Sequence, residues 1–198
     1  MHPNVSTAEA RKHLLKHGEL PGSGLPSVLA RSWERSAASG LRPDHLARTD
    51  SQSNATDLRQ TLQFNHTLLA HARPVMEYLF EQVRESQNVV VLADGQGTLI
   101  HTLGDAPFLE RAERVALSNG ASWQEQHRGT NAIGTALAES LGVEIHGGEH
   151  FLAQHEFLTC AASPIVSFNG KLLGILDVSG DARAGHPHTL ALVNTPHA

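Results

Sequence analysis

A change in hydrophobic periodicity near Asn88 constrains the fold of this chain more than any other feature of its sequence. From Asp57 to Arg84, apolar residues recur at steps of three and four, which places one apolar stripe along a helix. After Asn88 the pattern becomes extended, because residues 89–93 form a short run rich in β-branched side chains. The sequence therefore predicts a helical first half and a second half that mixes strands and helices.

Two helices are expected in the first half. One opens at Pro26, where proline and serine suit a helix start, and ends at Gly40. The other is the long helix over 57–84. Pro74 removes a backbone donor inside it, so either a kink or a pair of helices is allowed. Residues 43–56 are rich in Asp, Ser and Asn and are predicted to be a polar linker.

Two β-hairpins are predicted in the second half. In the first, residues 94–97 turn the chain between two extended runs. In the second, Asn169-Gly170 supplies the positive φ that a tight turn between 160–166 and 171–178 requires. The other expected elements are helices at 107–117 and 130–139, a strand at 143–145 and a helix from Pro187. This order predicts an α+β fold with an antiparallel sheet.

We divide the chain into a helical N-terminal segment with its linker, residues 1–56, and an α+β domain, residues 57–198. Cys160 is the only cysteine, so no disulfide can form within the chain. No apolar run approaches the roughly 20 residues that cross a bilayer, and the polar start does not read as a signal sequence. We therefore expect a cytoplasmic chain that does not enter a membrane.

Charge is distributed unevenly between the two halves. Residues 1–87 hold 10 Lys and Arg against 9 Asp and Glu, a net charge of +1. Residues 88–198 hold 5 against 11, a net charge of −6. Proteins bind DNA largely by neutralising phosphates with Lys and Arg. Neither half is suited to that task, so this chain is not expected to bind nucleic acid directly.

Blocks of sequence that span about residues 27–193 carry a resemblance to a known family. They are Ser32-Trp33-Glu34-Arg35-Ser36 with Gly40–Pro43, then Arg128–Glu139, Gly148–Phe151, Leu158–Ile165 and Gly174–Gly180. In this order they resemble the sensor region of acetoin-regulator-like, sigma-54-dependent transcription activators. The resemblance implies a GAF domain, with helices on one sheet face for dimerisation and a pocket on the other face, roofed by loops and short helices.

The resemblance also implies partners. Activators of this kind continue into an AAA+ ATPase domain and a Fis-like helix-turn-helix domain. This sequence contains neither: Gly129 and Gly134 have the glycine spacing of a nucleotide-binding loop, but Thr135 stands where a lysine would contact the phosphates. The expected partners are a small organic effector, a second copy of the chain in a homodimer, and the AAA+ and helix-turn-helix domains of a full-length protein.

The start of the predicted helix 130–139 supplies three candidate ligand-binding residues. Thr130 and Asn131 can cap free amides, or they can meet a carbonyl or hydroxyl group of a ligand, and both readings stay open. Ile133 and the small residues around it allow the helix to approach the sheet closely. Gly129 and Gly134 are interpreted as structural.

Aromatic and histidine side chains supply three further candidates. Trp123 precedes the glycine-rich block and is a candidate pocket wall. His150 and Phe151 are pocket residues by resemblance, because family sensors carry Glu-His-Phe in the loop that closes the cavity. Trp33 is instead expected to pack against the long helix.

Metal binding and a cofactor are not expected. The residues considered as metal ligands are His146, Glu149, His150 and His155. Gly147-Gly148 interrupts any helix that would align His146 with His150. Thr159 occupies the position where a second histidine would complete a His-Glu-x-x-His motif.

Cys160 is a further candidate ligand-binding residue. It lies in a predicted strand, where a lone cysteine is usually a small buried apolar group. A redox or nitric-oxide sensor is the alternative. Methionine sulfoxide reductases of GAF fold rely on several cysteines, so a single one speaks against that enzyme. No Gly-x-Ser-x-Gly motif supports a hydrolase either. We therefore expect no enzymatic activity.

Asp177 is the last candidate ligand-binding residue. It alternates with its neighbours so that it shares one strand face with Ile175 and Ser179, opposite Leu176 and Val178. One of these two sets should face the ligand, and the sequence does not say which.

These observations predict an effector sensor. A small, uncharged or weakly polar metabolite would bind in the pocket, and the flanking helices would transmit the change to the ATPase. Ketols, ketones, alcohols and aromatic compounds all fit this description. The alternative is a structural dimerisation module whose interior is filled by its own side chains.

Overall fold

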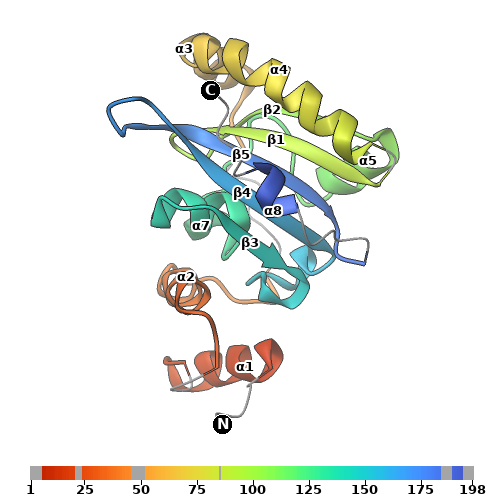
Figure 1. The fold of residues 1–198 in the computed structure, drawn as a ribbon. Coiled ribbons are helices and arrows are strands. Elements are labelled where there is room, and N and C mark those ends of the chain that lie inside the picture. Colours follow the sequence, from red (N-terminus) through yellow and green to blue (C-terminus); the bar gives the residue numbers. More distant parts are fainter. Residues whose placement is uncertain (1–5, 21–23, 46–51, 85, 184–188, 194–198) are drawn as a thin grey trace.

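The computed structural model describes residues 6–20, 24–45, 52–84, 86–183 and 189–193. A five-stranded antiparallel sheet with strand order β2-β1-β5-β4-β3 forms its centre (Figure 1). Its strands are β1 Asn88–Asp94, β2 Leu99–Gly104, β3 Val143–His146, β4 Leu158–Val166 and β5 Leu172–Asp181. Both predicted hairpins are present. They join along β1 and β5, where Val91 pairs with Asp177, so the α+β prediction is confirmed.

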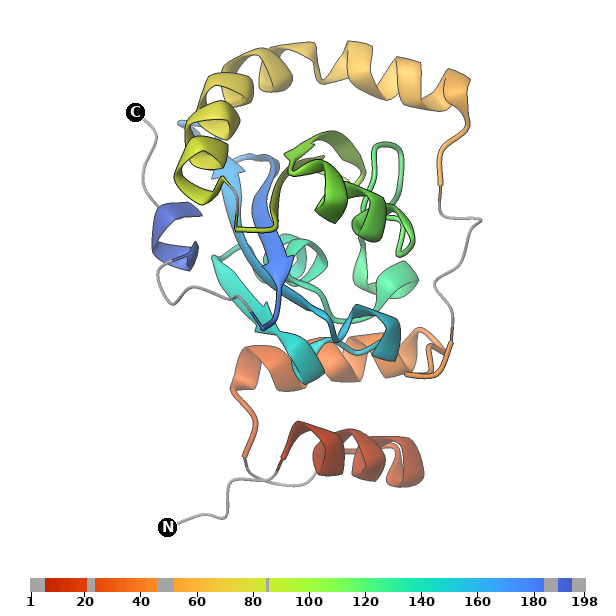
Figure 2. The same ribbon diagram turned by 90° about the vertical axis from the view of Figure 1, so that its right-hand side faces the viewer.

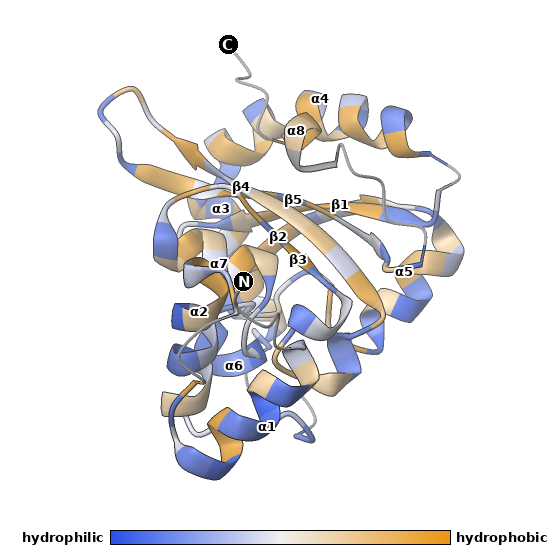
Figure 3. Ribbon diagram, turned by 60° about the horizontal axis from the view of Figure 1, so that its bottom comes forward, coloured by the Kyte–Doolittle hydropathy of each residue, from blue (hydrophilic) through white to orange (hydrophobic). Residues whose placement is uncertain are grey.

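One face of the sheet is covered by helices that flank it in sequence (Figure 3). These are α4 His66–Val83, which follows α3 Ala55–Phe64, and the short α8 Thr189–Val193. Met76 and Leu79 of α4 pack with Val90, Leu176 and Val178 of the sheet in an apolar core. All five side chains are buried, so this face is closed by aliphatic contacts.

The opposite face is covered by shorter elements and by the N-terminal helices. The short elements are α5 Ala106–Glu113, α6 Glu125–Arg128, α7 Ala132–Glu139 and the 3-10 turns η2 Gly147–Glu149 and η3 Ala153–His155. The N-terminal helices are α1 Thr7–His17 and α2 Ser27–Ala38. Figure 2 shows α2 lying beneath this layer and α1 outermost. Leu14 and Trp33 join the same core as Val91, so residues before 57 pack directly on the α+β domain.

The predicted long helix is two helices, and the break is not at the proline. Asn65 ends α3, and its side-chain Nδ2 donates to the carbonyl of Thr61 at 3.0 Å. Pro74 lies inside α4 without ending it. Of the two readings that the sequence allowed, the pair of helices is found, with the break at Asn65, where an asparagine side chain bonds to the preceding turn.

Two further expectations change. Trp33 does not pack against the long helix, because α2 and α4 lie on opposite faces of the sheet. Its ring lies 6.4 Å from that of Phe151, edge to face. The predicted linker is also partly structured: the amide of Ser53 donates to the carbonyl of Gly120 at 2.8 Å. The predicted start of the last helix at Pro187 lies outside the described residues.

Candidate functional site

Buried polar side chains gather on the α7-facing side of the sheet. We define the buried polar cluster as His150, His155, Cys160, Asp177 and Ser179. Each is at most 3% exposed. The strands β4 and β5 supply the last three, and the segment 147–157 supplies the two histidines. Polar groups at this depth must find partners or carry a free-energy cost.

Strand alternation places Asp177 and Ser179 in this cluster. Leu176 and Val178 pack toward α4, whereas Ile175 belongs to the core on the α7 side. The set that contains Asp177 therefore faces the loops and short helices, which is the side where the resemblance places a pocket.

Only one of the two carboxyl oxygens of Asp177 has a hydrogen-bond partner among the described residues. Its Oδ2 accepts a hydrogen bond from Ser179 Oγ at 2.6 Å. Its Oδ1 is buried and has no hydrogen-bond partner among the described residues. Burial raises the pKa of this carboxyl from its usual value to about 7, and the Ser179 hydroxyl only partly offsets that rise.

His150 is held as a neutral ring. Its Nδ1 lies 3.0 Å from the carbonyl of Gly147, so Nδ1 carries the proton and donates it. Its Nε2 lies 3.5 Å from Cys160 Sγ and accepts from the thiol. Burial lowers the pKa of His150 to about 4, which keeps the ring uncharged at neutral pH.

The surroundings of Cys160 favour the thiol form. Burial, with a contribution from the nearby charge of Asp177, raises the pKa of this thiol well above its usual value. Reactive cysteines need a thiolate, which electropositive and partly exposed surroundings provide. Cys160 has the opposite environment, as expected for a small buried group.

His155 stacks on Trp123, with ring centroids 5.0 Å apart and planes 26° apart. The same ring meets His150 edge-on at 6.2 Å. The Gln154 amide nitrogen lies 3.3 Å from His155 Nε2, which therefore accepts, and the ring proton is left on Nδ1. That Nδ1 is buried without a hydrogen-bond partner among the described residues. Burial also lowers the pKa of this ring.

The other predicted site residues are also buried. They are Thr130, Asn131, Ile133 and Phe151. Asn131 caps α7 by accepting from the Gly134 amide at 2.8 Å, and its Nδ2 donates to the carbonyls of Trp123 and Gly129. Both polar ends of this side chain are therefore engaged within the protein. Ile133 and Phe151 are buried core residues.

The glycines of this block are structural, as interpreted from the sequence. Gly129 has a φ of +64°, and a Cβ on it would lie 2.8 Å from the Cβ of Phe151. A Cβ on Gly134 would lie 2.6 Å from the carbonyl oxygen of Trp123. Both contacts are shorter than real Cβ atoms make, so only glycine permits this approach.

A second polar network fastens α2 to α6 and α7. Ser32 Oγ donates to Glu125 Oε1 at 2.5 Å and also lies 2.7 Å from Thr130 Oγ1. Thr135 Oγ1 donates to the same carboxylate at 2.9 Å. Thr130 therefore contributes its hydroxyl to helix docking. These contacts join the Ser32–Ser36 block to the Arg128–Glu139 block.

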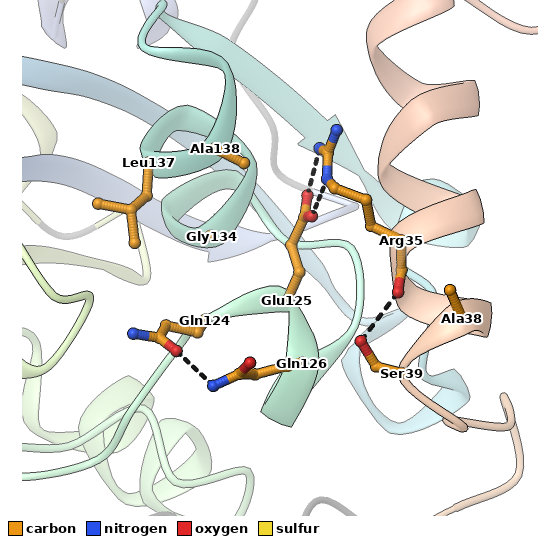
Figure 4. A pocket seen from close by; sticks show the side chains of 9 residues that line it. All are labelled: Arg35, Ala38, Ser39, Gln124, Glu125, Gln126, Gly134, Leu137 and Ala138. Carbon is orange, nitrogen blue, oxygen red and sulfur yellow. Dashed lines mark hydrogen bonds and ion pairs between the residues drawn. The ribbon is translucent and has the colours of Figure 1, made fainter.

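Ion pairs complete this network at the surface. Arg35 donates to Glu125 Oε2 at 2.5 Å (Figure 4) and to Glu139 Oε1 at 2.7 Å. Arg31 also pairs with Glu139, and hydrogen bonds from these two arginines hold the pKa of that carboxyl at about 2. A surface hollow of about 430 Å³ lies beside the Arg35–Glu125 pair, between α2, α6 and α7.

Sequence reasoning missed several of these residues. Glu125, Ser32 and Thr135 were not candidates, although each is buried and polar. His155 was considered only as a metal ligand, and Ser179 only as a neighbour of Asp177. A buried carboxylate that meets a serine hydroxyl 93 residues away leaves no local signal in the chain.

No group of three or more His, Cys, Asp or Glu residues among the described residues is arranged to hold a metal ion. None of the helices in the described part of the chain is long and apolar enough to cross a membrane.

A family model described as the MimR N-terminal domain matches residues 4–197. The acetoin dehydrogenase operon transcriptional activator AcoR of Bacillus subtilis is 33% identical over 91% of this chain and 30% of its own length. The propane 2-monooxygenase operon transcriptional activator MimR of Mycolicibacterium smegmatis is 30% identical over 94% of this chain and 31% of its own. The acetoin catabolism regulatory protein of Cupriavidus necator is 32% identical over 77% of this chain and 23% of its own.

A solved structure shares the fold. One chain of the crystal structure of the E. coli DhaR(N)–DhaL complex aligns with a TM-score of 0.79 over 85% of this chain and 57% of that chain, at 17% identity. This likeness identifies the fold as GAF-like, in agreement with the expectation from sequence.

Proposed function

Because the chain belongs to the MimR N-terminal domain family, we propose that it is the regulatory segment of a bacterial transcription activator and that it senses a small organic molecule at the buried polar cluster. The curated relatives that match it are transcriptional regulators about three to four times its length. The AAA+ and helix-turn-helix domains, and the dependence on sigma-54, belong to the proposed full-length protein.

The observation that carries this proposal is a pair of unsatisfied atoms in the cluster. Asp177 Oδ1 is an acceptor without a donor, and His155 Nδ1–H is a donor without an acceptor, among the described residues. Leaving a buried polar group unpaired costs about 1–3 kcal/mol. A bound molecule that pairs with either atom recovers part of that cost, so its binding is favoured.

The charge state of the cluster indicates the chemistry of the effector. Both histidines and the thiol are held neutral, and the carboxyl titrates near neutrality. An ionic ligand would bring an uncompensated charge into a buried site. We therefore propose a neutral effector with a hydroxyl or carbonyl group, bordered by Trp123 and His150.

A structural dimerisation module is the second candidate function. It is favoured by Thr130 and Asn131, whose side-chain polar atoms are engaged by protein groups. In that case the helices on the α4 face would pair two copies without a ligand. Sedimentation of the chain at increasing concentration tests the homodimer, which both candidate functions propose.

Thermal melting against a panel of small ketones, diols, alcohols and phenols tests the effector proposal. A compound at about 100 times its Kd stabilises the folded state by about 2.7 kcal/mol. For a domain of this size, that raises the Tm by roughly 5–10 °C. The Asp177→Asn variant should lose most of this rise, and the Phe168→Ala variant, changed at an exposed residue between β4 and β5, should keep it. A flat response of the wild-type chain across the panel would instead favour the structural module.

A further inference from the structure

Three successive backbone carbonyls of the segment 147–157 are bound by side chains of the N-terminal helices. Arg11 Nη2 donates to the carbonyl of Gly148 at 2.5 Å and to that of His150 at 2.8 Å. Trp33 Nε1 donates to the carbonyl of Glu149, between them, at 2.8 Å. Both α1 and α2 therefore hold the backbone of η2 and the residue after it.

Arg11 links both ends of this segment. Its Nη1 donates to Glu156 Oε1 at 2.7 Å, six residues beyond His150. Its guanidinium lies 5.4 Å from the centre of the Trp33 ring, and the side chain is only 12% exposed. A planar guanidinium with several donors can hold this set of acceptors at once, and an ammonium group lacks that geometry. Ala10 and Leu14 of α1 pack alongside in the core.

The same backbone carries the site on its other side. The carbonyl of His150 meets Arg11, while its ring lies 3.5 Å from Cys160 on the sheet. The ring of His155, next to Glu156, stacks on Trp123. The segment 147–157 therefore carries both kinds of group: side chains that face the buried polar cluster, and carbonyls that face α1. A shift of either group moves the other.

We propose that Arg11 is a positioning residue for the effector site, and that docking of α1 and occupancy of the buried polar cluster are coupled through the segment 147–157. A ligand that displaces the ring of His150 changes the positions of the carbonyls that Arg11 holds. Coupling of this kind is reciprocal, so loosening α1 changes ligand affinity by the factor by which the ligand changes α1 docking. The role of the ligand rests on the proposed function, whereas the positioning by Arg11 does not.

The ligand-free test measures hydrogen–deuterium exchange in wild type, Arg11→Gln and Lys12→Gln. Glutamine has nearly the helix propensity of arginine, so α1 can still form, and exposed Lys12 on the same helix is the matched control. The amides of Phe151 and Ala153, which donate to Thr130 and Pro43, report on the segment. We expect about ten-fold faster exchange over 147–156 in Arg11→Gln only, with no change over β1. Unchanged exchange over 147–156 in Arg11→Gln would overturn the positioning role.

The ligand arm uses the compound from the melting panel that gives the largest rise in Tm. We expect its affinity to differ about five-fold or more between Arg11→Gln and wild type, and not between Lys12→Gln and wild type. In wild type the compound should also change exchange in α1. Equal affinity in all three chains, with α1 exchange unaffected, would overturn the coupling. A panel with no binding compound would overturn the proposed function, while the ligand-free exchange would still decide the role of Arg11.

Discussion

The two faces of the central sheet are built from different chemistry. On the α4 side, Val90, Leu92, Leu176 and Val178 meet only aliphatic and other apolar groups in the core. On the α7 side, strands β4 and β5 present Cys160, Asp177 and Ser179 beneath a loop that carries two neutral histidines. The first face serves stability through these apolar contacts. The second face gives up part of that stability, because buried polar groups without a partner cost free energy.

The largest effect is expected when a carboxylate is moved to the wrong face. Val178 is the neighbour of Asp177 but points into the α4 core. Val178→Asp buries a carboxyl with no polar partner there, and we expect it to destabilise the fold by more than ~4 kcal/mol. Urea unfolding followed by circular dichroism measures this loss. A variant as stable as wild type would show that the two faces do not differ as described.

The second-largest effect is expected in the pH dependence of the unfolding free energy. Asp177 has a folded-state pKa of about 7, above its unfolded value near 3.8. About two pH units below 3.8 the carboxyl is protonated in both states. As pH rises from 4 to 7 the unfolded chain releases the proton more readily, so this group lowers the stability by up to ~4 kcal/mol.

Asp177→Asn should remove this pH-dependent loss of stability. The histidines act in the opposite sense, because the lowered pKa of His150 costs stability as pH falls from 6.5 toward 4. Their effect is common to both proteins. The difference in unfolding free energy between variant and wild type should therefore grow between pH 4 and 7 in favour of the variant, as denaturation at several pH values would measure. A difference that stays constant with pH contradicts the raised pKa.

A smaller effect is expected at the network that docks α2. Arg35→Ala leaves the carboxylate of Glu125, which is 7% exposed, without its ion-pair partner. We expect a loss of about 1–2 kcal/mol, because Ser32 and Thr135 still donate to Glu125. Faster proteolysis within α2, with the β1 and β5 strands still protected, is the expected readout. Equal proteolysis of variant and wild type would show that the ion pairs do not hold α2.

The smallest effect is expected on the outer surface of α4. Tyr78 is 60% exposed, and Tyr78→Ala should change the unfolding free energy by less than ~0.5 kcal/mol in a dilute sample. If α4 pairs two copies of the chain, the same variant should raise the dimer dissociation constant in sedimentation experiments. A large loss of monomer stability would contradict the exposed position of this side chain.

Period-two alternation in the strands was enough to predict both hairpins and to group Asp177 with Ile175 and Ser179. It was not enough to decide which layer each face meets, because alternation separates two faces without saying what covers them. The covering helices come from distant parts of the chain. Trp33 was misplaced for the same reason: its apolar character predicts burial but does not name the partner.

The helix pattern had a comparable limit. The apolar stripe continues from α3 into α4, so periodicity alone does not mark the break at Asn65. The contacts of Glu125 and Arg11 were also beyond sequence reasoning, since each joins segments separated by many residues. By contrast, the cap formed by Asn131 was one of the two readings that the sequence allowed, because a helix N-cap is a local interaction.

The pairing of β1 with β5 has a consequence for biosynthesis. Val91 pairs with Thr102 inside the first hairpin, but its partner on the other edge of β1 is Asp177 of β5. The first hairpin therefore leaves the ribosome long before the strand that pairs with its open edge. Closing so long a loop slows folding, and until then the edge of β1 and its valines are open to other chains. A nascent chain stalled before Leu172 should therefore depend on chaperones, although every residue of its first hairpin is already present.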